Sequence, residues 1–356
     1  MRLRLIGDVV FTTPLLRALR REYPAARLVY LVEADAAPVV RHNPHLDEVI
    51  VAPRTHGLRR IVDDLELAKQ LRRRRFDIAI DLHGGPRSGW LTLASGARER
   101  IGYAIPGRTW MYTRAVPRAR ELRPRHSVVN QWDLLEALPG WRGGEPRPDR
   151  DAVEMPLDAA ADARMASRLA RAGIREDDDL IVVHVSAGNR FRRWPEASFV
   201  RLVTDLARKG ASRRVAVSSG PSDCEAAARI AATAREQLGA CGSRVVDLGE
   251  FDLQELRALI GRSRLFVGGD TGPLHIAAAT KTAIVGIYGP TLSAQSAPWR
   301  DRETPTEAIE LTDLPCRPCD QRRCTPGDFR CLTRLSPDAV IDAAERAMAA
   351  AGPLHS

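Results

Sequence analysis

Residues 265–291, LFVGGDTGPLHIAAATKTAIVGIYGPT, decide the fold of this chain. An apolar run leads into the glycine-rich turn at 268–273, and a helix of small residues precedes a second apolar run. This order predicts strand, turn, helix and strand. A helix that starts directly after a strand has unpaired N–H groups and a positive dipole end, which suit a phosphate or diphosphate. Glycines that only permit tight geometry are the structural alternative.

The turn carries more polar groups than tight geometry requires. Asp270, Thr271 and His275 fall within about one helical turn of each other. They favour a ligand-binding turn over a purely structural one. Asp270 could either orient the turn or contact a ligand, and the sequence leaves both open.

The same alternation of strands and helices extends outward through both halves of the chain. It predicts an α/β protein whose parallel sheets have helices on both faces. Residues 139–157 lack periodicity and are rich in Gly and Pro, so we expect a linker there, with an edge strand near 152–155. The other expected strands are 3–6, 27–32, 48–51, 76–82, 180–185, 215–218 and 245–248. The expected helices include one that follows the turn at 7–8 and runs through Arg21, then 61–75, 128–138, 160–172, 253–261 and one starting at Ser336.

Length and composition indicate a globular protein of two domains. The chain has 356 residues, of which 44% are hydrophobic and 28% charged. No run of 18 apolar residues occurs, and the N-terminal sequence lacks a signal-peptide pattern, so we expect a cytoplasmic protein. Strand 3–6 is short for a first strand, which indicates either a late-assigned start or an unusually short strand.

The positive charge does not point to nucleic acid. The net charge is +9, yet aromatic residues make up only 5% and do not interleave with the basic runs at 72–75 and 114–125. We interpret 72–75 as a solvated helix face. The excess charge would suit an anionic membrane surface or a phosphorylated acceptor.

Three loops are expected at the carboxyl ends of strands, where doubly wound sheets bind ligands. They are residues 7–8, 186–193 and 268–273. Asp8 is either a first-turn carboxylate or a general base. The loop 186–195 joins small hydrogen-bonding residues to three arginines, whose planar guanidinium groups match phosphate oxygens.

The histidines and cysteines indicate no catalytic metal. The histidines lack metal-binding spacing, and we expect His184 to be a core residue. Four clustered cysteines could hold a structural zinc ion or iron–sulfur cluster, could form a cross-link, or could simply pack. They are Cys316, Cys319, Cys324 and Cys331.

Together the motifs resemble those of the ADP-heptose:lipopolysaccharide heptosyltransferases, glycosyltransferase family 9. The resemblance covers nearly the whole chain in order, and its most specific part pairs Asp-Thr-Gly-x-x-His with Tyr-Gly-Pro-Thr. The matching segments are IGDVVFTTP at 6–14, FDIAIDL at 76–82, RIGY at 100–103, RWP at 193–195, GDTGPLH at 269–275 and YGPT at 288–291.

The resemblance implies a GT-B fold, in which two Rossmann-like α/β domains face each other across a cleft. Residues 1–157 would form the acceptor-binding domain with the linker, and residues 158–335 the nucleotide-sugar-binding domain. Residues 336–356 would form a C-terminal helix that packs back on the N-terminal domain.

The resemblance also implies the roles of individual residues. Asp8 matches the general base, and Phe251 the side chain that packs on adenine. Arg193 stands where relatives often have lysine. The implied donor-phosphate residues are Ser186, Asn189, Arg190, Arg193, Asp270, Thr271, Gly272, Pro273 and His275; the nucleoside residues are Asp223, Glu225 and Phe251; the acceptor residues are Thr12, Thr13 and Arg87.

The implied reaction is inverting transfer of a heptose from ADP-heptose to the inner core of lipopolysaccharide in a Gram-negative bacterium. No Asp-x-Asp pair stands in a suitable loop, so no cofactor and no catalytic metal are expected. We expect a monomer at the inner face of the inner membrane, with no nucleic-acid partner. The alternatives are a transferase that uses another nucleotide sugar for a cell-surface glycan, and a degenerate sugar-nucleotide binder.

Overall fold

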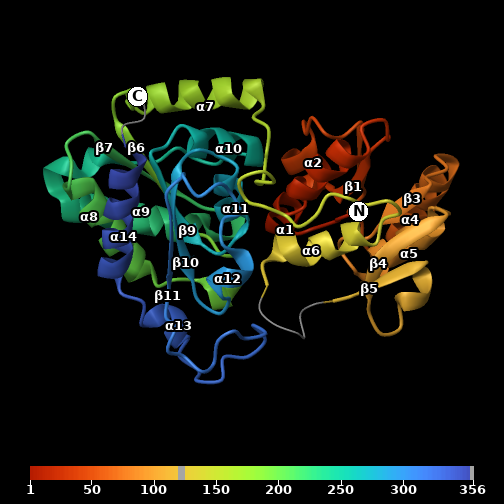
Figure 1. Ribbon diagram of the computed structural model, residues 1–356. Helices are drawn as coiled ribbons and strands as arrows, with labels where there is room; N and C mark the ends of the chain where they lie inside the picture. Colours follow the sequence, from red (N-terminus) through yellow and green to blue (C-terminus); the bar gives the residue numbers. More distant parts are fainter. Residues whose placement is uncertain (119–124, 353–356) are drawn as a thin grey trace. The chain divides into compact units, whose positions relative to one another are not determined.

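The computed structural model describes residues 1–118 and 125–352 (Figure 1). The chain divides into two compact units, Met1–Pro156 and Leu157–Ser356. Part of the basic run 114–125 and the last four residues of the expected C-terminal segment lie outside the described residues.

A six-stranded parallel sheet forms the centre of the C-terminal unit. Its order is β11-β10-β9-β6-β7-β8. Numbered along the unit, this is the order 3-2-1-4-5-6 of dinucleotide-binding folds, in which the chain changes direction between the first and fourth strands. Those two strands are β6 and β9 here. The strands are β6 (Asp179–His184), β7 (Arg213–Ser218), β8 (Val245–Val246), β9 (Leu265–Gly269), β10 (Ala283–Tyr288) and β11 (Thr306–Glu310).

Helices cover both faces of this sheet. On one face, α8 (Glu196–Arg208), α9 (Cys224–Leu238) and α14 (Pro337–Ala351) share one apolar cluster with alternate strand residues such as Ile181 and Val183. The intervening residues point to the opposite face, because side chains alternate along a strand. The remaining helices are α7 (Ala159–Arg171), α10 (Leu253–Gly261), α11 (Gly272–Ala278) and the short α12 (Ser293–Ser296) and α13 (Arg330–Thr333).

The final helix packs on the six-stranded sheet of the C-terminal unit, and its expected packing on the N-terminal domain stays a prediction. Val340, Ala344 and Ala347 lie on one face of α14 and are buried in the apolar cluster of the six-stranded sheet. The guanidinium of Arg213 on β7 donates two 2.7 Å hydrogen bonds to the carboxylate of Glu345 and so ties α14 to the sheet. Figure 1 shows α14 beside α8.

The N-terminal unit contains two parallel groups of strands, β1-β2 and β3-β4-β5. Residues 1–3 join them: Arg2 N–H donates to Leu31 O, and Leu82 N–H donates to Met1 O. If this segment counts as a first strand, the unit repeats the order 3-2-1-4-5-6. The strands are β1 (Val29–Glu33), β2 (Glu48–Ala52), β3 (Ile78–Ile80), β4 (Glu99–Ala104) and β5 (Arg114–Pro117), and the helices are α1 (Ile6–Val10), α2 (Thr13–Glu22), α3 (Ala37–Val40), α4 (Gly57–Arg73), α5 (Pro86–Ala94) and α6 (Ser127–Glu136).

Three local expectations in this unit are wrong. The extended segment is 1–3 rather than 3–6, because α1 already begins at Ile6. The helix expected after residues 7–8 and through Arg21 is instead two helices, since α1 already contains residues 7–8 and the chain breaks before α2, where Pro14 lacks the N–H that a continuous helix would need. No strand forms at 152–155, where the Glu154 N–H donates to the Thr13 hydroxyl instead of to a neighbouring strand.

Candidate active site

Two loops leave the C-terminal sheet side by side. His184 at the end of β6 is in register with Gly268 on β9. The arginine loop at 186–193 and the turn at 269–271 therefore emerge from neighbouring strands at the same edge. This is the position at which doubly wound sheets bind ligands.

Asp270 is the buried centre of the turn. Its carboxylate accepts a 2.6 Å hydrogen bond from Thr291 and lies 3.4 Å from His275 Nε2 and 3.3 Å from Arg192. Burial alone would raise the pKa of Asp270, but His275, Arg192 and Thr291 together lower it to about 2. With its oxygens used inside the protein, Asp270 orients the turn, which supports the first of its two open roles.

Arg192 links the two loops and was missed as a site residue. Its guanidinium donates 2.6 Å to the backbone oxygen of Asp270 and 2.9 Å to Gln321, which also accepts from Asn189. Three arginines in the loop signalled an anion site. The short helix at 190–192 determines which of these arginines points toward the turn at Asp270, and the sequence alone does not predict that helix.

Ser186, Asp223 and Arg193 form a second linked group. The buried Asp223 carboxylate accepts a 2.5 Å hydrogen bond from Ser186 and lies 3.0 Å from Arg193. Arg193 also donates to Ala187 O and keeps 48% of its side chain exposed. These contacts favour Arg193 as an anion ligand. They do not support the expectation that Asp223 binds a ribose, because its oxygens already have partners.

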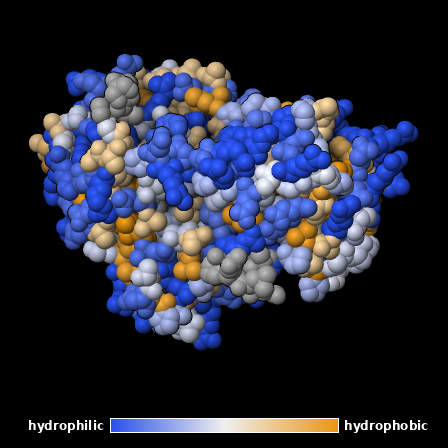
Figure 2. All heavy atoms as spheres, viewed as in Figure 1, coloured by the Kyte–Doolittle hydropathy of each residue, from blue (hydrophilic) through white to orange (hydrophobic). Residues whose placement is uncertain are grey.

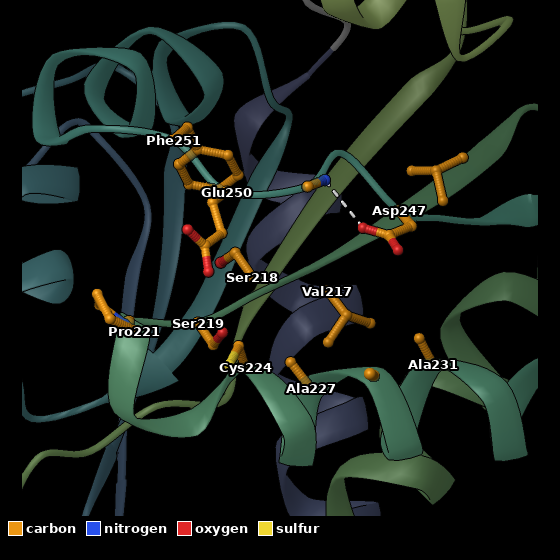
Figure 3. Close-up of a pocket in the computed structure, with 14 residues that line it drawn as sticks. Val217, Ser218, Ser219, Pro221, Cys224, Ala227, Ala231, Asp247, Glu250 and Phe251 are labelled. Atoms are coloured by element: carbon orange, nitrogen blue, oxygen red, sulfur yellow. Dashed lines mark hydrogen bonds between the residues drawn. The ribbon is translucent and has the colours of Figure 1, made fainter.

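A cavity of about 250 Å³ opens beside this group. It lies at the carboxyl ends of β7 and β8 and against the start of α9, and Figure 3 shows Phe251 and the carboxylate of Glu250 beside Ser218. Its volume is just below the roughly 300–1,000 Å³ of pockets for whole small molecules. Phe251 lines this cavity, whereas the exposed Glu225 does not.

The remaining residues that were expected to bind phosphate lie mostly at the start of α11. Thr271 is the residue before the helix, Gly272 and Pro273 begin it, and all three are partly exposed. His275 is buried and faces Asp270. Arg190 is exposed and its guanidinium lies 5.4 Å from the ring centre of Phe191.

In the N-terminal unit, Asp8 stands in the first turn of α1 at the end of the extended segment. Its carboxylate lies 2.5 Å from the guanidinium of Arg2, and its side chain is 35% exposed against 11% for Arg2. Arg2 in turn donates 2.6 Å to Leu82 O. The ion pair fixes the Asp8 carboxylate and leaves it within reach of solvent.

His83 lies close to the same charges and was not predicted as a site residue. Burial and the charge of Arg2 lower the pKa of His83, against the opposing effect of Asp81 and Asp8. Its Nδ1 lies 3.1 Å from Arg4 O. A neutral imidazole therefore neighbours Asp8 at neutral pH. A lone histidine in the sequence gives no signal for this, because its contact with Arg4 O joins residues that are 79 positions apart.

Asp81 shapes the loop that carries His83. It is fully buried, and its carboxylate accepts hydrogen bonds from the backbone N–H groups of His83 and Gly84 and from the hydroxyls of Ser88 and Tyr112. Burial and the charge of Asp81 raise the pKa of Tyr112, which keeps this hydroxyl protonated as a donor.

The three expected acceptor residues are engaged within the unit. Thr12 and Thr13 are buried and donate to the carbonyl oxygens of Val9 and Val10. Arg87 is held by Glu33 at 2.7 Å and by Asp64 at 2.6 Å. These contacts do not support acceptor binding by these side chains. They indicate that Thr12 and Thr13 stabilise the α1–α2 junction and that Arg87 anchors α5.

The four clustered cysteines surround one cavity of about 30 Å³, next to Phe191 and Pro290. All are free thiols, so the structure contains no cross-link between them. Within residues 1–118 and 125–352, no set of three or more His, Cys, Asp or Glu side chains is arranged to hold a metal. The segment instead backs the arginine loop: Phe329 packs edge-on against Phe191 at 5.3 Å, and Cys319 N–H donates to Pro290 O.

Comparison with known proteins identifies relatives along most of the chain. The chain is 26% identical over 329 residues to lipopolysaccharide heptosyltransferase 3 of Escherichia coli, covering 90% of this chain and 91% of that one. The glycosyltransferase family 9 protein of Veillonella parvula has the same fold, with a TM-score of 0.84 at 23% identity over 98% and 95% of the two chains. ADP-heptose lps heptosyltransferase II of E. coli matches with a TM-score of 0.75 at 20% identity over 98% and 99%.

These likenesses confirm the GT-B fold of two Rossmann-like domains. Residues 65–328, which include the arginine loop, the cavity at Phe251 and the turn at Asp270, match the sequence model described as glycosyltransferase family 9 (heptosyltransferase). The chain therefore belongs to glycosyltransferase family 9, the heptosyltransferase family.

Proposed function

We propose that this protein is an inverting glycosyltransferase that moves a heptose from ADP-heptose to the inner core of lipopolysaccharide, with Asp8 as the general base. The observation that carries the proposal is the carboxylate of Asp8, fixed by Arg2 and open to solvent, in a chain of family 9. The donor and the acceptor are those named for the relatives, lipopolysaccharide heptosyltransferase 3 and ADP-heptose lps heptosyltransferase II.

The C-terminal unit supplies the donor site in this proposal. The cavity at Phe251 takes the adenosine, with the aromatic ring against the base. The diphosphate lies toward Arg193 and Arg190, with Ser186, Asn189 and the Thr271–Pro273 turn as further contacts. The two loops are held together by the contacts of Asp270 with Arg192 and His275, which do not themselves touch the donor in this proposal.

The reaction is a direct displacement at the anomeric carbon. Asp8 accepts the proton of the acceptor hydroxyl as its oxygen forms the new glycosidic bond. The bond from the anomeric carbon to the diphosphate oxygen breaks, and ADP leaves with the electron pair. Attack from the face opposite the leaving group inverts the configuration. Arg193 and the backbone N–H groups of the turn stabilise the charge that develops on the diphosphate.

The proposal extends to partners and location. The acceptor is a membrane glycolipid, which places the enzyme at the inner face of the inner membrane, and the enzyme works as a monomer without nucleic acid. Among the described residues, no helix combines the length and hydropathy needed to cross a bilayer.

A donor comparison tests this function. Purified protein is incubated with heptose-deficient lipopolysaccharide and, in parallel, with ADP-heptose, a GDP-sugar or a UDP-sugar, and the product mass and the released nucleotide are measured. Turnover with ADP-heptose alone is the expected result. Turnover with another nucleotide sugar would reassign the donor. A thermal shift with ADP-heptose but no turnover with any donor would identify a sugar-nucleotide binder.

A further inference from the structure

Helix α4 (Gly57–Arg73) is only half embedded in the N-terminal unit. Its C-terminal half buries Leu67 and Leu71 in an apolar cluster with Leu3, Leu31 and Leu91. The acidic side chains Asp63 and Asp64 are turned toward the protein body, where they bind Thr55 and Arg87. Together these contacts account for how the helix is held.

The N-terminal half of α4 presents a second apolar face, and this one points to solvent. Leu58 is 82% exposed, Ile61 57%, Val62 54% and Leu65 48%. At about 100° per residue, these four side chains lie within an arc of about 100°. A surface helix normally turns its apolar stripe to the core, so a solvent-exposed stripe of four large aliphatic residues indicates an interaction surface.

The same face becomes basic toward the end of the helix. Lys69 and Arg72 continue the arc of Leu58 and Leu65, and both are exposed. They border a groove at the amino ends of β3 and β4, whose charged lining residues are Lys69, Arg72, Arg73, Arg75, Arg98 and the single acid Asp77. The apolar stripe is thus continuous with a concentration of positive charge.

We propose that this face of α4, formed by Leu58, Ile61, Val62, Leu65, Lys69 and Arg72, docks the protein on the anionic headgroup surface of a lipid bilayer. Aliphatic side chains of a helix lying in the membrane plane enter the boundary of the acyl chains, while arginine and lysine attract anionic lipids. Beyond its first turn the backbone of α4 is internally hydrogen-bonded, so Ile61, Val62 and Leu65 can enter this region without exposing unpaired N–H groups.

Charge selects the bilayer over a second copy of this chain. Two copies that met through this face would bring like basic grooves together, in a protein that already carries a net charge of +9. An anionic lipid surface offers acyl chains to the apolar stripe and negative headgroups to the basic groove. The inference uses only exposure and charge, so it stands independently of the proposed reaction.

Vesicle sedimentation of the full chain tests the inference without donor or acceptor. The probes are vesicles of phosphatidylcholine alone and vesicles that also contain phosphatidylglycerol. We expect binding to the anionic vesicles, weakened by added salt. The combined Leu58→Ser, Ile61→Ser and Leu65→Ser variant should bind at least about tenfold more weakly, and Arg72→Glu with Arg73→Glu should lose about tenfold or more.

Matched controls lie in the other unit. Leu157→Ser removes a comparably exposed leucine, and Arg302→Glu reverses a comparably exposed arginine. Both should bind like the wild type. Thermal unfolding shows that each variant is folded, and a thermal shift with ADP reports the donor site separately, so failure of one proposal does not imply failure of the other.

Three results would overturn the assignment of α4 as a membrane-binding surface. The first is wild-type protein that stays in the supernatant when the anionic vesicles are pelleted. The second is α4 variants that sediment with these vesicles as strongly as the controls do. The third is a wild-type dimer in size-exclusion chromatography that becomes a monomer in the serine variant, which would show that a second copy of the chain covers this face of α4.

Discussion

Arg2 lies 2.5 Å from Asp8 and joins the carboxylate to the backbone oxygen of Leu82. The carboxylate therefore does not turn freely on α1, because its partner is fixed between β1 and the loop after β3. The fixed carboxylate keeps one position from which it could accept a proton.

This contact makes Arg2 a positioning residue whose loss should lower kcat more than it weakens donor binding. In Arg2→Met, the carboxylate loses the partner that orients it, so kcat should fall while KM for the nucleotide sugar stays nearly unchanged. Arg2→Lys keeps the charge and should restore part of kcat. Steady-state kinetics of the three proteins check this. A rise in KM as large as the loss of kcat in Arg2→Met would point to a purely structural role.

Asp270 should stabilise the C-terminal unit in a pH-dependent way. Its pKa of about 2 lies below the ordinary value of 3.8, so the stabilisation is complete above pH 4 and is lost as the pH falls from about 4 to about 2. Asp270→Asn should lower the free energy of unfolding at neutral pH by about 2 kcal/mol. Denaturant unfolding between pH 2 and 6 (roughly the range set by the linkage relation) should show a shallower acid loss for the variant. If the free energy of unfolding of wild type and Asp270→Asn fell equally between pH 4 and pH 2 (roughly the range of the linkage relation), the stabilising role of the Asp270 carboxylate would be contradicted.

Phe251 should contribute to donor binding more than to turnover. Phe251→Ala removes the aromatic wall of the cavity, so we expect KM for the nucleotide sugar to rise about tenfold with little change in kcat. Glu225→Ala is the matched control, because Glu225 is exposed and does not line the cavity. Steady-state kinetics of both variants check this. A control that raised KM as much as Phe251→Ala would remove the cavity from the donor site.

Arg193 should distinguish a guanidinium site from a simple positive charge. Arg193→Ala should weaken ADP binding about tenfold, because a charge-assisted hydrogen bond to phosphate is lost. Arg193→Lys keeps the charge but not the planar geometry and should fall between the two. Calorimetric titration with ADP measures all three. An unchanged affinity for ADP in Arg193→Ala would show that Arg193 does not bind the phosphate and serves only its contacts with Asp223 and Ala187.

The sequence predicted the elements that have strong local patterns. Residues 265–291 form β9, α11 and β10 as expected, because apolar runs and a glycine turn act locally. His184 is a buried core residue as expected, and burial lowers its pKa to about 4. By contrast β4, β5 and β11 were not predicted as strands, since their residues are partly exposed and charged, as in TEAIE at 306–310.

Side-chain partners that come from distant segments were beyond prediction. Arg87 matched a basic acceptor residue, yet Glu33 and Asp64, 54 and 23 residues away, bind its guanidinium. Asp223 matched a ribose ligand but is bonded by Ser186 across 37 residues. Motif spacing identified Asp8 as a candidate, and only the fold shows that Arg2 fixes it.

The most direct test of the account compares wild type with Asp8→Asn on heptose-deficient lipopolysaccharide and ADP-heptose. Mass measurement of the acceptor should show the gain of one heptose with wild type. The variant should be slower on the order of 100- to 10,000-fold while its affinity for ADP stays the same. Heptose transfer at the wild-type rate by Asp8→Asn, or no transfer by the folded wild type, would contradict the account.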